Sequence, residues 1–280
     1  MIKITQNLKS SKILQRRKKI LWLKIIFFCV GVGVVLFFLS WASHAEKFSI
    51  QAFNIEGAEA TREADLRALV ETHLVGNYLW LFSKKNIFLY PKRKIKKDIL
   101  ETFLRIQDAR LSFADFNSFT LKLKEREPFA LYCVSWGVLS VSEEEECYFM
   151  DGDAFIYARA MNFSDNVYFK YGDETASSSK NILGTTYLEG AREKQFEKVN
   201  LFIRFLKDIN INVYRLSVKE NGDYVLYFDG DSQLIFDAEQ DFEIILEDLR
   251  AVLIDLDGSG ERRFEYIDLR FDNKVLYKFL

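Results

Sequence analysis

The sequence predicts a single transmembrane helix followed by an α+β ectodomain that is built from two modules. Three observations support this fold class: an uncharged apolar run near the amino terminus, a change of charge across that run, and a switch between helical and strand periodicity after it. The chain has 280 residues, of which 49% are hydrophobic. This composition excludes a disordered chain, and the length allows one or two globular domains.

The apolar run supplies the predicted membrane anchor, over residues 25–44. Ile25–Trp41 contains 17 residues without a charge. With its flanks it reaches about 20 residues, the length at which a helix crosses about 30 Å of hydrocarbon. Trp22 and Trp41 lie near its two ends, where aromatic rings favour the membrane interface. A signal peptide that is cleaved after Ala45 is the alternative interpretation.

The charge of the chain changes sign across the apolar run. Residues 1–24 carry eight basic side chains and no acidic one, and the remainder carries 31 basic against 41 acidic residues, a net charge of −10. By the positive-inside rule, the basic tail of residues 1–24 stays in the cytoplasm and the ectodomain lies outside the cell membrane. The acidic ectodomain argues against nucleic acid as a partner, because phosphate binding needs clustered Lys and Arg.

The first module, residues 47–127, is predicted to have the order β-α-α-β-β. Strand-like alternation marks Phe48–Ala52, and helical spacing follows Thr61, which we expect to be the N-cap. Pro91 suits the first turn of a second helix. Two further alternating runs, Ala109–Phe113 and Leu121–Leu123, predict the remaining strands. Both helices are expected to cover one face of the three-stranded sheet.

An aromatic connection, residues 77–91, joins the two predicted helices. We expect its rings to pack over the sheet, since aromatic side chains bury large apolar areas. An exposed docking patch and a loop that touches the membrane are the alternatives.

The second module, residues 128–280, is predicted to be a mostly antiparallel β domain with two helices. Short apolar runs between turn residues indicate strands, and helical spacing indicates helices over Glu189–Asn210 and Asp241–Leu256. The chain closes with predicted strands over Tyr266–Phe271 and Val275–Phe279. Residues 162–188 are expected to be a mobile, Ser-rich stretch.

Two phrases of the sequence carry a resemblance to a known family. The first is F-x-I-x-x-F-x-I-x-G, from Phe48 to Gly57, and the second is S-F-T-L-K-L-K-E-R-E-P-F-A, from Ser118 to Ala130. Together with the anchor they resemble the FtsQ/DivIB proteins of bacterial cell division, whose ectodomain has a POTRA domain followed by a β domain. The matching residues of the second phrase are Thr120, Leu121, Leu123, Glu125, Arg126, Pro128 and Ala130.

The resemblance implies a non-enzymatic scaffold that holds other division proteins at the septum of the cell (inner) membrane. In that family a partner of the FtsB/FtsL type adds a strand to the carboxy-terminal edge of the β domain. By motif position, the implied partner-binding residues are Tyr266, Leu269, Arg270, Phe271, Val275 and Tyr277. Since Ile267, Leu269 and Phe271 alternate, we expect them to face the core, and we expect Tyr266 and Arg270 to point outward.

Catalytic motifs are missing from the sequence, and no cofactor or metal site is predicted. The histidines are His44 and His73, and the chain has no G-x-S-x-G, H-E-x-x-H or P-loop. Asp255–Gly260 resembles the start of an EF-hand loop, but Tyr266 stands at the twelfth position, so a Gly-rich turn is predicted. Two other functions remain open: a POTRA-containing arm for protein secretion or assembly, and a membrane-anchored enzyme that cleaves glycans with a pair of carboxylates.

Cys133 and Cys147 form a candidate disulfide if the ectodomain lies in an oxidising compartment. Such a bond would close a loop of about 15 residues and would stabilise the fold by about 3 kcal/mol in the chain-entropy model. Free buried thiols are the alternative.

Overall fold

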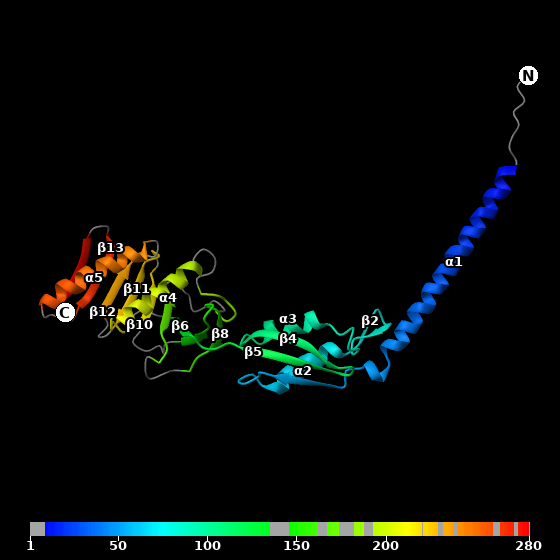
Figure 1. The fold of residues 1–280 in the computed structure, drawn as a ribbon, viewed down its shortest axis with the longest axis horizontal. Coiled ribbons are helices and arrows are strands. Elements are labelled where there is room, and N and C mark those ends of the chain that lie inside the picture. The colour runs from blue at the N-terminus through cyan, green and yellow to red at the C-terminus, as the bar shows by residue number, and fades with distance from the viewer. Residues whose placement is uncertain are drawn as a thin grey trace, which may run out of the picture. The chain divides into compact units, whose positions relative to one another are not determined.

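The computed structural model describes residues 9–134, 146–161, 167–173, 182–187, 193–219, 221–228, 232–237, 240–259, 264–271 and 274–279. Of these, residues 9–15, 193–194 and 253–259 are described by their backbone alone. The chain divides into two compact units, Met1–Glu125 and Arg126–Leu280, which are shown in Figure 1.

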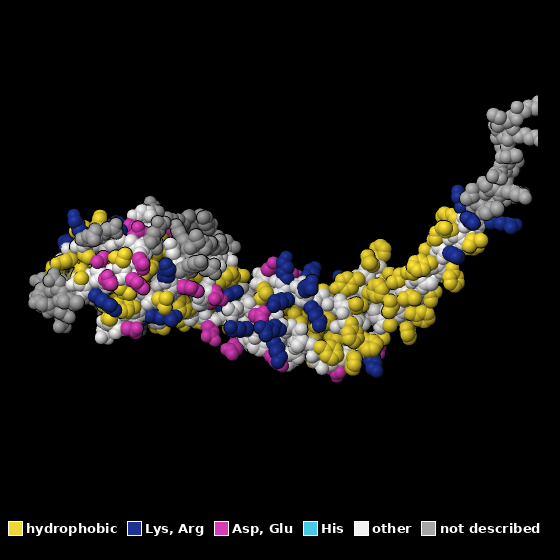
Figure 2. Space-filling model, turned by 45° about the horizontal axis from the view of Figure 1, so that its top comes forward, with side chains coloured by type: hydrophobic (Ala, Val, Ile, Leu, Met, Phe, Trp, Pro, Cys, Tyr) yellow, Lys and Arg dark blue, Asp and Glu magenta, His cyan; other side chains and the backbone are white. Residues whose placement is uncertain are grey.

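The first unit begins with the long apolar helix α1 (Lys9–Ser43). Hydrophobic side chains cover most of its length and Lys and Arg gather near its beginning, as Figure 2 shows. The segment Arg16–Ser43 is long and apolar enough to cross a membrane, although a signal sequence would meet the same criterion. The prediction of one apolar amino-terminal helix is therefore confirmed, and the helix is a candidate membrane span. It also includes residues 9–24 of the predicted basic tail.

A three-stranded sheet forms the body of the first unit, with β1 (Ala52–Glu56), β5 (Ser118–Glu125) and β4 (Ile106–Asp115) in that order. β1 runs parallel to β5, and β4 runs antiparallel to it. α2 (Glu63–Leu74) and α3 (Lys92–Thr102) precede β4 in the chain, so the long elements follow the predicted β-α-α-β-β order. Both helices contribute to one core with the sheet, which contains Leu66, Val70, Ile95, Ile99, Phe119 and Leu121.

Two local predictions for the first unit are wrong. The strand expected at Phe48–Ala52 begins at Ala52, because Phe48 ends the short 3-10 turn η1 (Glu46–Phe48). The backbone N–H of Ile50 donates instead to the carbonyl of Lys85, at 2.9 Å. Thr61 does not cap α2, whose N-cap is Arg62. The N–H of Thr61 donates to Glu125 Oε1, at 2.9 Å.

The second unit contains a nine-stranded mixed sheet and two helices, α4 (Glu193–Asp208) and α5 (Phe242–Ser259). The strand order is β14-β13-β12-β11-β10-β9-β6-β7-β8. The ring of Phe202 in α4 contacts Phe242 of α5 and Phe236 of β12, so both helices lie on the same face. The strands are β6 (Ala130–Val134), β7 (Glu146–Met150), β8 (Ile156–Arg159), β9 (Lys170–Asp173), β10 (Val213–Val218), β11 (Tyr224–Phe228), β12 (Ser232–Phe236), β13 (Phe264–Phe271) and β14 (Lys274–Phe279).

Among the described strands, the sheet of the second unit is mostly antiparallel, as predicted, with five antiparallel pairs and three parallel ones. β6 with β9, β9 with β10, and β12 with β13 are parallel pairs. Parallel neighbours need a crossover connection, and α4 connects β9 to β10 while α5 connects β12 to β13. α5 continues to Ser259, so residues 255–259 are helical and the Gly-rich turn predicted there is wrong. Gly260, the last residue of the predicted turn, lies outside the described residues.

β9 (Lys170–Asp173) is a strand in the middle of the sheet that falls inside the stretch 162–188. It lies between β6 and β10, and Tyr171 is almost fully buried there. The strand has only four residues, and its two buried residues, Tyr171 and Gly172, are adjacent and do not alternate with exposed ones, so periodicity gives no signal for it. The Ser-rich residues 174–181 lie outside the described residues.

Candidate functional site

β14 forms one edge of the nine-stranded sheet, and within the described part of the chain its only strand partner is β13. The opposite edge strand, β8, is partly covered. The N–H of Ile156 donates to the carbonyl of Thr185, at 2.9 Å, and the N–H of Gly184 donates to the carbonyl of Ile156, at 2.8 Å. An edge strand with unpaired ladder groups is a template for strand addition, so β14 is the edge suited to a partner.

β13 places the predicted partner-binding residues in different environments. Ile267 and Leu269 are buried in the core, as expected, and Tyr266 is half-buried. Phe271, however, is 45% exposed, so the expectation that it faces the core is wrong. Asp268 pairs with Leu276 and Phe271 pairs with Lys274, so β13 uses one residue more than β14 across this interval. Such a bulge resets the alternation of faces, which explains the exposure of the Phe271 ring.

β14 carries apolar side chains on both of its faces. Directly opposite residues share a face, so Tyr277, opposite Ile267, lies on the face that bears the helices, and Leu276, opposite Asp268, lies on the other. Val275 is half-buried and packs against the core. Tyr277 and Leu276 are exposed. Leu276 lies outside the partner-binding residues that the resemblance implies, although its apolar side chain interrupts the alternation of Lys274–Phe279.

Arg270 makes its contacts inside the unit. Its guanidinium bonds to both carboxylate oxygens of Asp268, at 2.9 and 2.6 Å, and to Asp223 Oδ2 at 2.7 Å. Burial pushes the pKa of Asp268 up, but its hydrogen bonds and charge interaction with Arg270 outweigh burial, and the pKa lies below its ordinary value. Arg270 therefore ties β13 to the residue before β11, and we assign it a positioning role.

Two of the matching residues of the second resemblance phrase are charged, and they lie in different units. Glu125, in the first unit, accepts hydrogen bonds from the backbone N–H groups of Glu59, Ala60 and Thr61, at 3.2, 3.0 and 2.9 Å. Burial raises the pKa of Glu125, but these hydrogen bonds outweigh it, and the pKa is lowered. The carboxylate thus fixes the segment that follows β1.

Arg126, in the second unit, pairs with the buried carboxylate of Asp151. The other oxygen of Asp151 accepts the backbone N–H groups of Asp153 and Phe155, at 3.0 and 2.9 Å. The guanidinium also lies over the ring of Phe155, 4.0 Å from its centre. Arg126 therefore anchors the entry of the chain into the second unit to the turn between β7 and β8.

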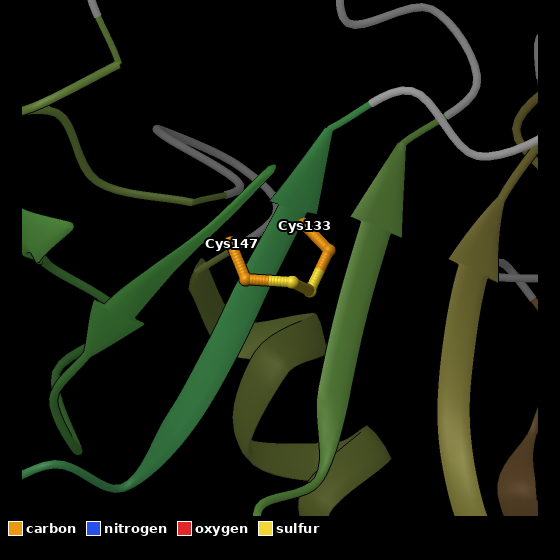
Figure 3. Close-up of a disulfide and its surroundings, with 2 residues drawn as sticks. All are labelled: Cys133 and Cys147. Atoms are coloured by element: carbon orange, nitrogen blue, oxygen red, sulfur yellow. A yellow bond between two sulfur atoms is a disulfide. The ribbon is translucent and has the colours of Figure 1, made fainter. Parts of the chain in front are cut away.

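Cys133 and Cys147 are joined by a disulfide between β6 and β7, shown in Figure 3. They are directly opposite residues of the antiparallel pair, with Cα atoms 4.1 Å apart. Leu131 is buried beside them, and the rings of Phe149 and Tyr168 pack against the same cluster.

Replacing Cys133 and Cys147 with alanine should lower the free energy of unfolding of the second unit by about 3 kcal/mol, because a loop of about 15 residues is no longer closed in the unfolded state. Urea unfolding of the purified full chain, with and without reductant, measures the effect. Reductant should shift the midpoint of the unaltered chain and leave that of the variant unchanged. An equal response of both chains would contradict the prediction.

The two histidines, His44 and His73, make contacts that stabilise the first unit. The side chain of His73 is largely buried, with Nε2 2.8 Å from Asp98 Oδ2. His44 caps the end of α1, with Nδ1 2.8 Å from the carbonyl of Ser40. Across the described ranges, no three His, Cys, Asp or Glu side chains gather in the way that a metal ion would require.

Comparison with known proteins gives no further assignment. A scan of the chain against protein-family models finds no match. A search of curated proteins likewise finds no match.

Proposed function

We propose that this chain is a membrane-anchored, non-enzymatic scaffold of the bacterial division machinery, of the FtsQ/DivIB type. In this proposal α1 crosses the cell membrane, residues 47–127 form a POTRA domain, and residues 128–280 form the β domain. The protein would recruit other division proteins to the septum, and an FtsB/FtsL-like partner would add a strand to β14.

The observation that carries the proposal is the phrase Ser118–Ala130, together with its position in the fold. Its first part forms β5, the central strand of the three-stranded sheet. Glu125 and Arg126 then anchor the end of one unit and the start of the next. Glu125 and Arg126, two of the residues on which the resemblance rests, thus each have a structural task, which supports a family motif over a chance match.

The exposed edge supports the recruiting role. β14 is short, lies at the end of the sheet and presents Leu276 and Tyr277 at the surface. A strand added to β14 would gain main-chain hydrogen bonds, and these two side chains, on opposite faces, would give specificity.

Depletion of the protein in its own cells tests the proposal directly. We expect undivided filaments or chained cells, and we expect a fluorescent fusion to collect at midcell. Normal division together with uniform membrane fluorescence would refute the proposal.

Leu276→Lys should weaken capture of the FtsB-like protein of the same cell by at least about tenfold, because a lysine on an exposed edge opposes strand addition. Leu276 is 48% exposed, so the fold should tolerate the change. The measurement is copurification with the full chain in detergent.

Leu201→Lys is the matched control for Leu276→Lys. Leu201 lies on α4 of the same unit and is 62% exposed, so the same substitution there should leave capture unchanged. Equal capture by the two variants would show that β14 is not the binding edge.

A further inference from the structure

The connection between α2 and α3 forms a hairpin with an apolar, exposed tip. Its strands are β2 (Asn77–Tyr78) and β3 (Phe82–Ser83). Trp80 at the tip is 94% exposed, and Leu79 is also highly exposed. The expectation that the aromatic connection packs over the sheet is therefore wrong for the tip, although Tyr90, further along, is buried. Large apolar side chains at a solvent-exposed tip indicate a binding surface.

The backbone of the tip is strained to present these side chains. The N–H of Leu81 donates to the carbonyl of Tyr78, at 2.9 Å, and closes a β-turn. Its central residues, Leu79 and Trp80, have φ of 47° and 61°. Positive φ at both positions defines a type I′ turn, which favours Asn-Gly and disfavours large side chains. Leu79 and Trp80 thus hold backbone conformations that are uncommon for large side chains, and such positions cluster at functional sites.

The hairpin is fixed against the last turn of α1. Ser40 Oγ donates to the carbonyl of Leu81, at 2.5 Å, and the N–H of Ser83 donates to Ser43 Oγ, at 3.3 Å. Asn86 is buried, and its side-chain amide donates to the carbonyl of Ser43, at 3.0 Å. The tip therefore lies beside the end of the apolar helix, where a membrane that α1 crosses would have its outer surface.

A group of exposed aromatic rings lies around Phe48, which ends the 3-10 turn that follows α1. The ring of Phe48 lies 5.8 Å from Phe88 and 6.2 Å from Phe116. Phe116 in turn contacts Phe113, at 5.9 Å. Phe88, Phe113 and Phe116 are all exposed, and Figure 2 shows hydrophobic side chains on the surface of the first unit beside α1. Aromatic rings at this level match the belt that membrane proteins place at the interface.

Cationic side chains accompany the apolar tip. Lys84 lies over the ring of Tyr78, with Nζ 5.6 Å from the ring centre, and Lys85 follows it in the chain. An apolar tip flanked by lysines fits a bilayer that has anionic headgroups above an apolar interior.

We propose that the β2–β3 hairpin inserts Leu79 and Trp80 into the outer leaflet of the membrane that α1 crosses. Phe88, Phe113 and Phe116 then lie at the level of the headgroups. This inference rests on the membrane anchor of the proposed function, and it adds a second lipid contact that seats the first unit on the bilayer.

The test uses the full chain in vesicles of phosphatidylethanolamine and phosphatidylglycerol. The protein has four tryptophans, so Trp22→Phe, Trp41→Phe and Trp136→Phe together leave Trp80 as the reporter. We expect brominated lipids to quench its fluorescence and aqueous acrylamide to leave it nearly unaffected. Quenching by acrylamide alone, or protection from both quenchers by a protein contact, would overturn the proposal.

A second variant, in which Trp41 is the only tryptophan, tests the membrane anchor separately from the insertion of the hairpin. Quenching of Trp41 and Trp80 by brominated lipid supports both. Quenching of Trp41 without Trp80 overturns the hairpin insertion and leaves the anchor in place. Absence of lipid quenching at both positions overturns both.

A turn replacement tests whether the tip seats the unit on the lipid. Leu79→Asn with Trp80→Gly supplies the preferred type I′ residues, so amide protection of β2 and β3 against hydrogen exchange should persist. Phe116→Trp then serves as the sole tryptophan. Its quenching by brominated lipid should fall by about half or more when the tip is replaced, because the apolar contact is lost. Unchanged quenching with an intact hairpin would overturn the seating role.

Discussion

Replacing Gly57 with alanine is expected to destabilise the first unit by about 4 kcal/mol, the sum of backbone strain and overpacking. Gly57 has a φ of +82°, which an L side chain rarely adopts, and a Cβ built there would lie 2.2 Å from the carbonyl oxygen of Leu123. That oxygen belongs to β5, which is paired on both sides, with β1 and with β4. Since β5 cannot shift away without breaking its hydrogen bonds to β1 or β4, relieving the clash would destabilise the sheet.

Gly76→Ala is the matched control, because it shares the strain and lacks the clash. Gly76 has a φ of +89°, and a Cβ there would meet no heavy atom within 4 Å. Its cost should be about 1 kcal/mol, the lower end of the range for a strained backbone. Urea unfolding of the full chain, followed by hydrogen exchange of the β5 amides, reports on the first unit. Equal losses in the two variants would show that the approach to Leu123 is unimportant.

The first unit shows which features local periodicity can predict. β4 and β5 lie where the alternating runs of Ala109–Phe113 and Leu121–Leu123 predict strands, because one of their faces is buried. The alternation of Phe48–Ala52 gave the wrong start for β1. Ile50 is buried in the core of the first unit, but its backbone N–H bonds to the carbonyl of Lys85 and not to a neighbouring strand of the sheet, and Phe48 packs against the same core from the 3-10 turn. Core residues that lie just outside a strand can therefore share the period of those inside it.

The candidate site depends on contacts between residues that are distant in sequence. The position of Arg270 is set by Asp223, which precedes β11 and lies 47 residues away in the chain. The exposure of Phe271 is set by a register shift against β14. A β-bulge and a distant counter-ion leave no pattern in the sequence of the strand itself. The motif could therefore predict which strands lie at the edge of the sheet, but not which side chains are exposed there.

Replacing Arg126 with methionine is expected to destabilise the second unit by about 3 to 5 kcal/mol, the cost of leaving a buried carboxylate without its partner. The side chain of Asp151 is 6% exposed and that of Arg126 is 14% exposed, so water cannot replace the lost guanidinium. Methionine also removes the guanidinium from over the ring of Phe155, so the measured loss includes this cation–π contact as well as the ion pair. Urea unfolding of the full chain, read from hydrogen exchange of the β7 amides, gives the magnitude.

Two further variants decide whether burial causes the effect of Arg126→Met. Arg159→Met removes the exposed pair with Glu146, whose atoms lie 3.3 Å apart, and should cost less than about 1 kcal/mol. Adding Asp151→Asn to Arg126→Met removes the unpaired charge, while the amide oxygen can still accept the N–H groups of Asp153 and Phe155. The double variant should therefore be more stable than Arg126→Met alone. If Arg126→Met costs no more than Arg159→Met, the pair does not anchor the entry of the chain into the second unit, and the structural reason for Arg126 in the phrase is lost.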